Sequence, residues 1–586
     1  MALVLVAGRL AYVQVLQSGH YQAEASQELT QLVTVPALRG PVTDRNGVVL
    51  ETSVPTEMVV ADDFQVQHPQ SEARALAPLL GTSARALVPL LSERSGYVPL
   101  VRNLPTQQAK KVAALAFPGI TMIGDSMTEM PEGNLASPVV GAVNAAGTGA
   151  AGLEYEYNRL LAGHSGHETL LESPTGVQIP GTGVAEKMPA VAGTGLQLTL
   201  DVPLQYVAEQ DLAKEMIASN ALRGIAVVMD VHTGQILAMA NLVSTSATAG
   251  NGTAPEHTTA PSGASGLVTI GPGGPVDEAP GNLAVTTLYE PGSVFKLVTF
   301  SAALADGVIS PSTTFSVPDR RVVDGWVFHD AETHPVEQMS ATQILAQSSN
   351  IGTSFVAQDL GEARLLSQVR RLGFGSPTPL GFPGSSPGLL VGPSQWNPTD
   401  FVSLAIGQTD AVSALQMVDA YNAIADGGVF VQPELVRATL RADGAPHPAA
   451  APRRHRVVPA RTAQELTTML EQVVDAGTGV AASVPGYLVA GKTGTSQIPN
   501  GHGGYITGAF DGTFVGFAPA NHPVLSAIVV LTRPQPIYGG SVAAPVFSQV
   551  MSYALHHYDV PTSPGLGNRP QAQVPTTSAK LVRAAA

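Results

Sequence analysis

The stretch Tyr289-Glu290-Pro291-Gly292-Ser293-Val294-Phe295-Lys296 is the part of the sequence on which the fold interpretation depends. Pro-Gly breaks the chain directly before an apolar run, so the stretch predicts a helix whose first turn holds Ser293. Lys296 follows one turn later on the same face. A serine hydroxyl becomes a strong nucleophile only with a base in hydrogen-bond reach, and a lysine can be that base if burial or a second cation lowers its pKa. The backbone N–H groups of this helix start could stabilise an oxyanion.

Lysine is rare in the chain, which makes this serine-to-lysine spacing informative. The sequence has seven lysines, and among them only Lys296 has a serine three residues before it. A single Ser-x-x-Lys quartet can still arise by chance. The quartet alone therefore suggests, but does not establish, a nucleophile and its base.

Two further short motifs follow the quartet. Gln347-Ser348-Ser349-Asn350 comes directly after a helical segment, and Ala490-Gly491-Lys492-Thr493-Gly494-Thr495-Ser496 comes after the apolar residues 487–489. The second of these predicts a strand in which a glycine permits close backbone approach. Each motif alone is weak, since Ser-x-Asn is common in loops and Lys-Thr-Gly can be an ordinary strand end.

The order Ser-x-x-Lys, Ser-x-Asn, Lys-Thr-Gly resembles the signature of penicillin-binding proteins and serine β-lactamases. The chain is most similar to a class B penicillin-binding protein of the FtsI type, which acts in cell division. The resemblance extends to about residue 558 and includes further segments: Arg39–Gly47, Gly152–Gly163, Ala405–Gln408, Phe514–Pro519 and Tyr538–Phe547.

The resemblance implies roles for the matching side chains. Ser293 would attack the penultimate D-Ala carbonyl of a peptidoglycan stem peptide, and Lys296 would take its proton. Ser348 would relay a proton to the leaving amine, Asn350 would orient the substrate amide, and Lys492 would help to keep Lys296 neutral.

The strand of the third motif would hold the substrate. Thr493, Gly494 and Thr495 are the expected substrate-binding residues, and the strand would pair with the substrate backbone. The backbone N–H groups of Ser293 and Thr495 would form the oxyanion hole. An amine of a second stem peptide would then resolve the acyl-enzyme, whereas a β-lactam would remain trapped on it.

The expected fold is an α+β multidomain protein with an antiparallel sheet flanked by helices in its penicillin-binding, β-lactamase-like part. The chain has 586 residues, more than one core usually serves. The predicted parts are a partial transmembrane anchor at 1–18, a pedestal (dimerisation-type) domain at 27–190, a transpeptidase domain at 195–560 with a flexible insertion at 243–280, and a disordered tail at 561–586.

Composition limits the kinds of partner. The formal net charge of −15 argues against nucleic acid, which needs a basic surface, and the absence of cysteine excludes disulfides and thiolate metal sites. No cofactor and no metal site is expected. The resemblance implies that the partners are stem peptides, β-lactams as inhibitors, a membrane glycosyltransferase of the FtsW/RodA class and other divisome proteins.

The N-terminal residues bear on localisation. The first 16 residues are mostly apolar but contain Arg9 and Gln14, and a spanning helix needs about 20 apolar residues. The segment is interpreted as one end of a single-pass anchor whose other half lies upstream, which would place the catalytic domain outside the cytoplasm. An amphipathic N-terminal helix is the alternative.

Other functions remain as alternatives. An elongation-type class B transpeptidase would use the same chemistry with another partner. A β-lactamase would need a deacylating base, and the segment starting at Glu362 lacks the asparagine expected beside one. A β-lactam sensor would need several transmembrane segments, a non-catalytic scaffold would not need all three motifs, and no glycosyltransferase domain is recognisable.

Overall fold

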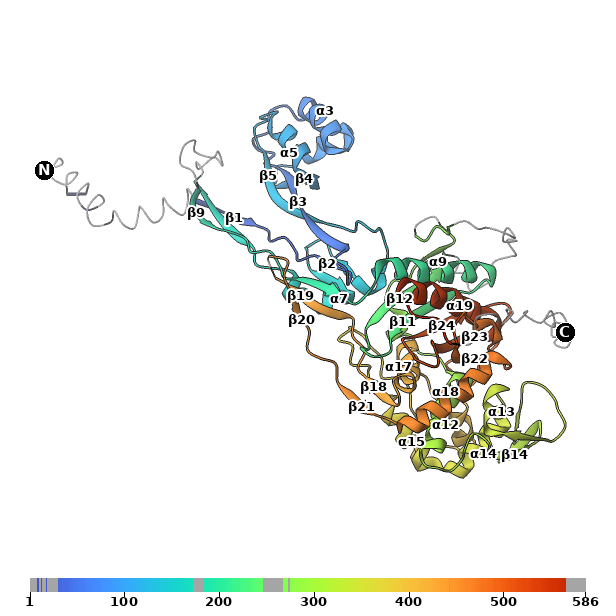
Figure 1. Cartoon of the computed structure of the whole chain (residues 1–586). Helices are drawn as coiled ribbons and strands as arrows, with labels where there is room; N and C mark the ends of the chain where they lie inside the picture. Colours follow the sequence, from blue (N-terminus) through green and yellow to red (C-terminus); the bar gives the residue numbers. More distant parts are fainter. Residues whose placement is uncertain are drawn as a thin grey trace.

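The structure is a computed structural model that describes residues 8–9, 12, 17, 30–171, 184–245, 267–271, 274–441 and 443–564. A slender N-terminal arm leads into a compact C-terminal body (Figure 1). Nearly all of the predicted anchor, most of the predicted insertion and most of the predicted tail lie outside the described residues. Among the helices of the described part, none is long and apolar enough to cross a membrane.

The body is built on an antiparallel sheet, as expected. Within the described residues it has six strands in the order β13 (Val276–Glu278), β12 (Ile236–Ser244), β11 (Arg223–Asp230), β24 (Leu525–Thr532), β23 (Tyr505–Ala518) and β22 (Ala490–Pro499). The apolar runs on either side of Thr233-Gly234 are typical of a hairpin, and β11 and β12 form one there. β13 lies within the predicted insertion, so the end of that segment is an ordered edge strand.

Both faces of this sheet are covered because its central strands are apolar along most of their length, on both faces. Ile225, Val227 and Met229 of β11 face one core, and the alternate residues Ala226 and Val228 face the other. The second face is covered by α9 (Val202–Ala218) and α19 (Gly539–His557), and the first by α17 (Ala414–Ala425) and α18 (Ala460–Asp475). The result is three layers, α, β and α.

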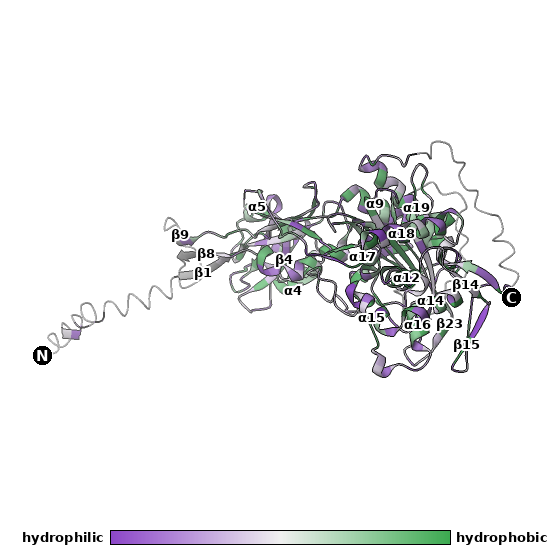
Figure 2. Cartoon of the chain, turned by 60° about the horizontal axis from the view of Figure 1, so that its bottom comes forward, coloured by the Kyte–Doolittle hydropathy of each residue, from purple (hydrophilic) through white to green (hydrophobic). Residues whose placement is uncertain are grey.

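A helical region beside the first face contains the buried helix α12 (Lys296–Ala305). The same part of the body holds short helices and turns: α11 (Leu283–Thr286), η2 (Gly292–Phe295), α13 (Ala341–Ala346), α14 (Asn350–Leu360), α15 (Glu362–Arg371), η3 (Pro393–Gln395) and α16 (Asp400–Ala405). A further turn, η4 (Val480–Ala482), contacts α18 and α19 instead. Two-stranded antiparallel sheets pair β14 (Thr314–Val317) with β17 (Glu337–Ser340) and β18 (Val429–Val431) with β21 (Arg454–Arg456), and β15 (Arg320–Val323) forms a hairpin with β16 (Trp326–His329). Figure 2 shows hydrophobic segments gathered in the body and a hydrophilic β15 at its periphery.

A second sheet joins the arm to the body. Its seven described strands are β20 (Pro446–Pro448), β19 (Val436–Leu440), β10 (Gly195–Leu198), β2 (Val42–Thr43), β3 (Val49–Ala61) and β4 (Val98–Pro105), with β5 (Ile120–Glu129) also paired to β3. Asn46-Gly47 between apolar runs is a hairpin signal, and β2 and β3 pair on either side of this turn. Because β10 pairs with β2 on one side and β19 on the other, strands from distant parts of the sequence form one sheet.

The arm ends in a small head with its own core. The helices α3 (Pro69–Leu80), α4 (Ala84–Leu90) and α5 (Thr106–Ala113) pack around β3, β4 and β5 through buried residues such as Leu76, Leu87 and Val112. A separate antiparallel sheet contains β1 (Thr30–Val35), β8 (Gly166–Leu171) and β9 (Val184–Met188). The connection between these parts contains α6 (Ser137–Val140), β6 (Ala142–Val143), β7 (Gly149–Ala151), α7 (Gly152–Glu156) and α8 (Asn158–Leu161).

Two of the arm segments that carried the family resemblance meet at Arg39. Its guanidinium forms a buried ion pair with Glu154 and donates hydrogen bonds to Asn158 Oδ1 (2.9 Å) and the Gly147 carbonyl (2.8 Å). Burial and the neighbouring Glu154 raise the pKa of Glu51 to about 8. The charge of Arg39 opposes this rise, so one arginine lies close to two buried carboxyl groups.

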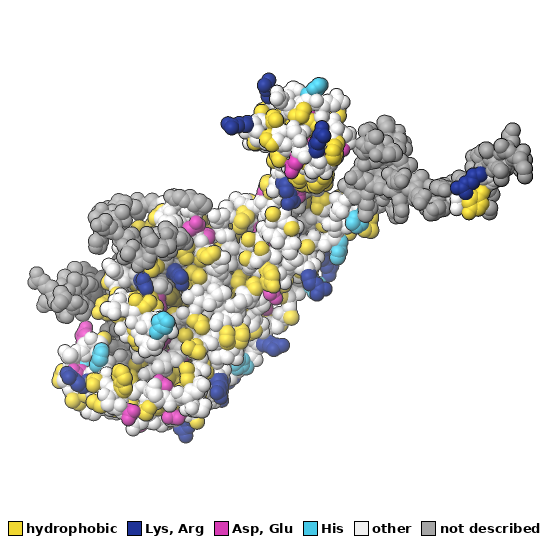
Figure 3. Space-filling model, turned by 180° about the vertical axis from the view of Figure 1, so that it is seen from behind, with side chains coloured by type: hydrophobic (Ala, Val, Ile, Leu, Met, Phe, Trp, Pro, Cys, Tyr) yellow, Lys and Arg dark blue, Asp and Glu magenta, His cyan; other side chains and the backbone are white. Residues whose placement is uncertain are grey.

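The charged surface has no single-sign patch on the face that Figure 3 shows. Lys and Arg side chains are scattered along the arm and body there, with Asp, Glu and hydrophobic side chains between them. The formal net charge of the whole chain is −15.

Candidate active site

The predicted nucleophile lies in a tight turn at the start of a buried helix. Ser293 belongs to the 3₁₀ turn η2, and Lys296 is the first residue of α12, so the expected α-helical first turn is a 3₁₀ turn instead. Side chains three residues apart eclipse each other in a 3₁₀ turn, which aligns Ser293 with Lys296. The Ser293 side chain is half-buried, whereas Lys296 is fully buried.

The turn that holds Ser293 is supported by residues far away in the sequence. Gly292 has φ 57° and donates its N–H to the Gly407 carbonyl (2.8 Å), and the Tyr421 hydroxyl donates to the Val294 carbonyl (2.8 Å). A Cβ on Gly407 would lie 2.2 Å from the Gly292 carbonyl oxygen. The segment 405–408, noted from the sequence only through its family resemblance, therefore supports the nucleophile turn.

Lys296 joins the first motif to the second. Its Nζ donates to Asn350 Oδ1 (2.8 Å), to the Ser348 carbonyl (2.6 Å) and to Ser348 Oγ (3.3 Å). Ser348 has φ 62°, a conformation that residues other than glycine seldom adopt. The structure thus brings Lys296, Ser348 and Asn350 into one hydrogen-bonded group.

The third motif lies on β22, which ends the body sheet. Lys492 is fully buried and donates to the Thr493 carbonyl (3.1 Å) and Thr493 Oγ1 (3.4 Å). A Cβ on Gly494 would lie 3.0 Å from the Pro291 carbonyl oxygen and 3.1 Å from Val294, so glycine allows β22 to approach the nucleophile turn closely.

The two threonines of this motif are also engaged. Thr493 Oγ1 lies 2.6 Å from Thr478 Oγ1. Thr495 Oγ1 accepts a hydrogen bond from the N–H of Gly539 (3.2 Å), the first residue of α19. A Cβ on Gly292 would lie 3.4 Å from the Thr495 carbonyl oxygen, which places β22 beside the turn of Ser293.

Burial strongly affects both lysines. Burial lowers the pKa of Lys296 to about 7, although the charge of Asp330 raises it. Burial, and then the charge of Lys296, lowers the pKa of Lys492 well below its usual range. A large fraction of Lys296 is therefore neutral near pH 7 and available as a base, because burial disfavours its charged form.

Other residues of the site carry no sequence signal. Asp330, eighteen positions before Ser348, accepts hydrogen bonds from Ser349 and the backbone of Asn350, and no motif surrounds it. The Tyr505 hydroxyl donates to Glu290 Oε2 (3.0 Å), which links the end of β23 to the residue before Pro291-Gly292. These contacts join segments whose spacing in the sequence follows neither a helix nor a strand period, so a sequence pattern could not reveal them.

This arrangement supports acyl transfer to a hydroxyl. It contains a serine at a helix start, a buried neutral amine, a serine within reach of that amine and an amide that orients it. Across the described ranges, no three His, Asp or Glu side chains are grouped as metal ligands.

Comparison with known families agrees with this geometry. The penicillin-binding protein transpeptidase domain matches residues 224–552, and the penicillin-binding protein dimerisation domain matches residues 34–198. The first match contains all the predicted site residues, and the second covers the arm.

Several proteins are similar over nearly the whole chain. The penicillin-binding protein PbpB of Mycobacterium tuberculosis is 33% identical over 599 residues, covering 97% of this chain and 85% of that protein. The peptidoglycan D,D-transpeptidase FtsI of Escherichia coli K12 is 27% identical, covering 96% and 90%. The crystal structure of penicillin-binding protein 3 from M. tuberculosis with aztreonam superposes with a TM-score of 0.68 at 30% identity, covering 92% of this chain and 100% of that one. The chain therefore belongs to the class B penicillin-binding proteins, with a dimerisation domain followed by a transpeptidase domain.

Proposed function

We propose that this chain is a peptidoglycan D,D-transpeptidase that cross-links stem peptides through an acyl-enzyme on Ser293 and that β-lactams acylate the same residue. The observation that carries the proposal is the hydrogen-bonded group of Lys296, Ser348 and Asn350 beside the turn of Ser293. The relatives named as peptidoglycan D,D-transpeptidases, and the relative solved with aztreonam, support the substrate and the inhibitor class.

Acylation begins with proton transfer from Ser293 to Lys296. As Ser293 Oγ bonds to the carbonyl carbon of the penultimate D-Ala, the neutral amine of Lys296 takes the hydroxyl proton. The Lys296 Nζ to Ser348 Oγ contact of 3.3 Å supports passage of a proton through Ser348 to the leaving nitrogen. The C–N bond then breaks, and the terminal D-Ala leaves as a neutral amine.

Deacylation repeats these steps in reverse order. The amine of a second stem peptide attacks the ester carbonyl and loses a proton to the same relay, the C–O bond to Ser293 breaks, and Ser293 regains its proton. The N–H groups of Ser293 and Thr495 stabilise the oxyanion in both steps. A β-lactam retains its amine on the acyl group, so the second step is slow.

Substrate binding uses the free edge of β22. In the described body sheet β22 is the terminal strand and pairs with β23 on one side, so its other edge can accept an extended peptide. Thr493 and Thr495 bind the substrate carboxylate, and Gly494 keeps this edge close to the nucleophile turn.

The cellular role proposed is septal cell-wall synthesis. The similarity to FtsI of E. coli over 96% of this chain supports it. The protein is anchored at the cell membrane by its N-terminal segment, with the catalytic domain outside the cytoplasm, and works with a glycosyltransferase of the FtsW/RodA class and other divisome proteins. An elongation role is the alternative, and septal or lateral-wall localisation of a tagged protein decides between them.

Covalent labelling tests the chemistry. Ser293→Ala should abolish labelling by a fluorescent penicillin, because it removes the hydroxyl that forms the ester. Ser312→Ala, in an exposed loop, is the matched control and should label like the unaltered protein. Persistent labelling of Ser293→Ala would refute the assignment, and rapid turnover of the labelled ester would indicate a β-lactamase instead.

A further inference from the structure

Asp330 is a buried carboxylate directly behind the Ser348–Asn350 turn. It follows β16, is 8% exposed, and accepts hydrogen bonds from Ser349 Oγ (2.7 Å) and from the backbone N–H groups of Asn350 (2.5 Å) and Ile351 (3.1 Å). These N–H groups belong to the first turn of α14, where a negative charge is favourable. One side chain thus fixes the position of the second catalytic motif.

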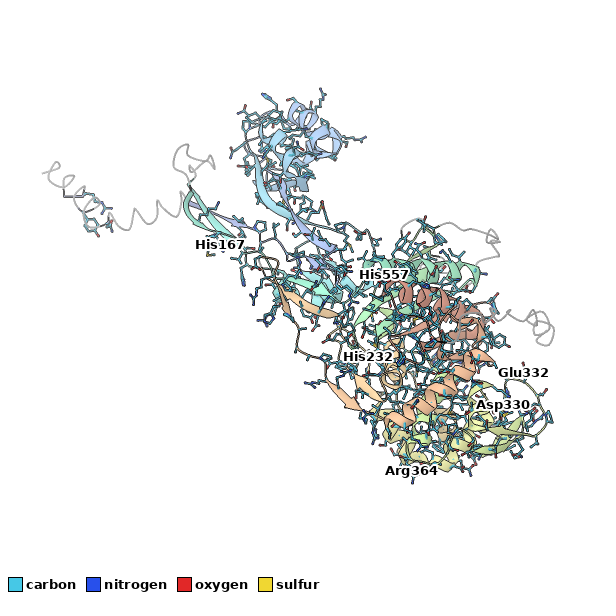
Figure 4. The ribbon with its side chains drawn as sticks, in the orientation of Figure 1. His167, His232, Asp330, Glu332, Arg364 and His557 are labelled. Carbon is cyan, nitrogen blue, oxygen red and sulfur yellow. The ribbon has the colours of Figure 1, made fainter. Side chains whose placement is uncertain are left out.

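The loop that carries Asp330 is itself anchored on α14. Asn350 Nδ2 donates to the His329 carbonyl (3.1 Å). Arg321 of β15 donates to Ser354 Oγ (2.8 Å) and Gln358 Oε1 (2.6 Å). Figure 4 places Asp330 and Glu332 in the part of the body that holds α14 and β14. The segment directly after the β15–β16 hairpin therefore holds Asp330 against the first turn of α14.

Asp330 also acts on the general base. Its charge raises the pKa of Lys296 against the larger effect of burial, which leaves that pKa at about 7. The other charged groups around this pair are Lys492 on β22, whose own pKa burial lowers, and His334, whose Nε2 lies 3.2 Å from Asp330 Oδ2. His334 in turn faces Glu337 and Asp319.

We infer that Asp330 is a positioning residue for the transpeptidase reaction, which holds the Ser348–Asn350 turn against Lys296 and stabilises the ammonium that Lys296 becomes when it takes the Ser293 proton. The inference rests on the proposed function of the site. The hydrogen bonds of Asp330 go to Ser349, Asn350 and Ile351, behind the catalytic turn. Asp330 acts through Lys296, because a base that has just gained a proton in a buried site needs a nearby negative charge.

The test separates charge from position. Asp330→Asn keeps an acceptor oxygen for the N–H groups of α14 but removes the charge, whereas Asp330→Ala removes both. Asp324→Asn is the matched control: Asp324 is exposed in the turn of the same hairpin, and its φ of 48° suits asparagine. The measurement is the second-order rate constant of acylation by a fluorescent penicillin from pH 5 to pH 10, on the full chain.

Asp330→Asn should move the rising limb of the rate profile to lower pH and lower its alkaline plateau by about tenfold, because Lys296 becomes a weaker base. Asp330→Ala should lower the plateau further, and Asp324→Asn should change neither feature. An unchanged profile in Asp330→Asn, or a uniform loss without movement of the limb, would overturn the inference. The result for Asp330→Asn tests the inference even if Asp330→Ala does not fold. The labelling of Ser293→Ala tests the proposed function separately.

Discussion

At the scale of single residues, Lys296 shows how burial produces reactivity. Three hydrogen-bond acceptors surround its Nζ, which would favour the charged form, but complete burial outweighs them and the pKa is lowered to about 7. Lys492 is also fully buried, and burial, together with the charge of Lys296, holds its pKa well below its usual range. Near neutral pH Lys296 therefore loses its proton readily.

The pH dependence of acylation should reveal the pH at which Lys296 loses its proton. Because only neutral Lys296 can accept the Ser293 proton, the acylation rate should rise with pH through about 7 and then level off. Lys296→Arg keeps a cation that cannot lose its proton and should lower the plateau by about 10² to 10⁴. Stopped-flow acylation with a fluorescent penicillin measures both. A wild-type profile that is flat between pH 5 and 9 would contradict the role of Lys296 as base.

At the scale of elements, close backbone contacts at glycines bring the first and third motifs together. Gly407 packs on the nucleophile turn, Gly494 on Pro291 and Val294, and Gly539 against the backbone of residues 494 and 513. Each contact lets one backbone approach its neighbours more closely than a side chain would permit. These glycines therefore help to set the position of η2 relative to β22.

Gly407→Ala should therefore displace the nucleophile turn. The new Cβ would lie 2.2 Å from the Gly292 carbonyl oxygen, and φ of 81° is unfavourable for alanine, so a destabilisation of about 1–3 kcal/mol and slower acylation are expected. Gly392→Ala is the matched control, because nothing lies within 4 Å of its Cβ position. Denaturant unfolding and labelling rates check both variants, and equal behaviour of the two would contradict the proposed packing role.

At the scale of the whole molecule, the arm and the body share both a sheet and a polar junction. β10 lies between β2 of the arm and β19 of the body. Beside it, Asp201 accepts hydrogen bonds from Asn46 of the arm (3.4 Å) and from Tyr558 at the end of α19 (3.1 Å), and pairs with His557 (3.1 Å). The same carboxylate caps α9 by accepting a hydrogen bond from the Leu204 N–H, the role that aspartate commonly has at the start of a helix.

Substitution of Asp201 should show how much this junction contributes. Asp201→Ala loses the cap and the arm contact, with an expected cost of about 1–2 kcal/mol in the free energy of unfolding. Asp201→Asn is as good a cap and should retain most of that stability. Chemical denaturation compares the two. An equal loss in both variants would show that the charge opposite His557, and not the cap, is what matters.

Local patterns in the sequence determined much of this protein. The strands β11 and β12, the turn at Asn46-Gly47, the Asp201 cap and the placement of Lys492 on a strand all follow from alternation, turn residues and capping within a few positions. The three motifs, through their family resemblance, also identified the residues that the structure brings together around Lys296. The predicted domain boundaries and the predicted roles of the individual site residues remain predictions.

Tertiary structure alone decided the rest, because it depends on contacts between residues distant in the sequence. The 3₁₀ form of the Ser293 turn accompanies its contact with Gly407, and the position of the Ser348–Asn350 turn depends on Asp330. The joining of β2, β10 and β19 into one sheet has no local signal either. The low pKa of Lys296 is the clearest case: the sequence shows a lysine near a serine, but burial, which only the packed fold creates, makes that lysine a base.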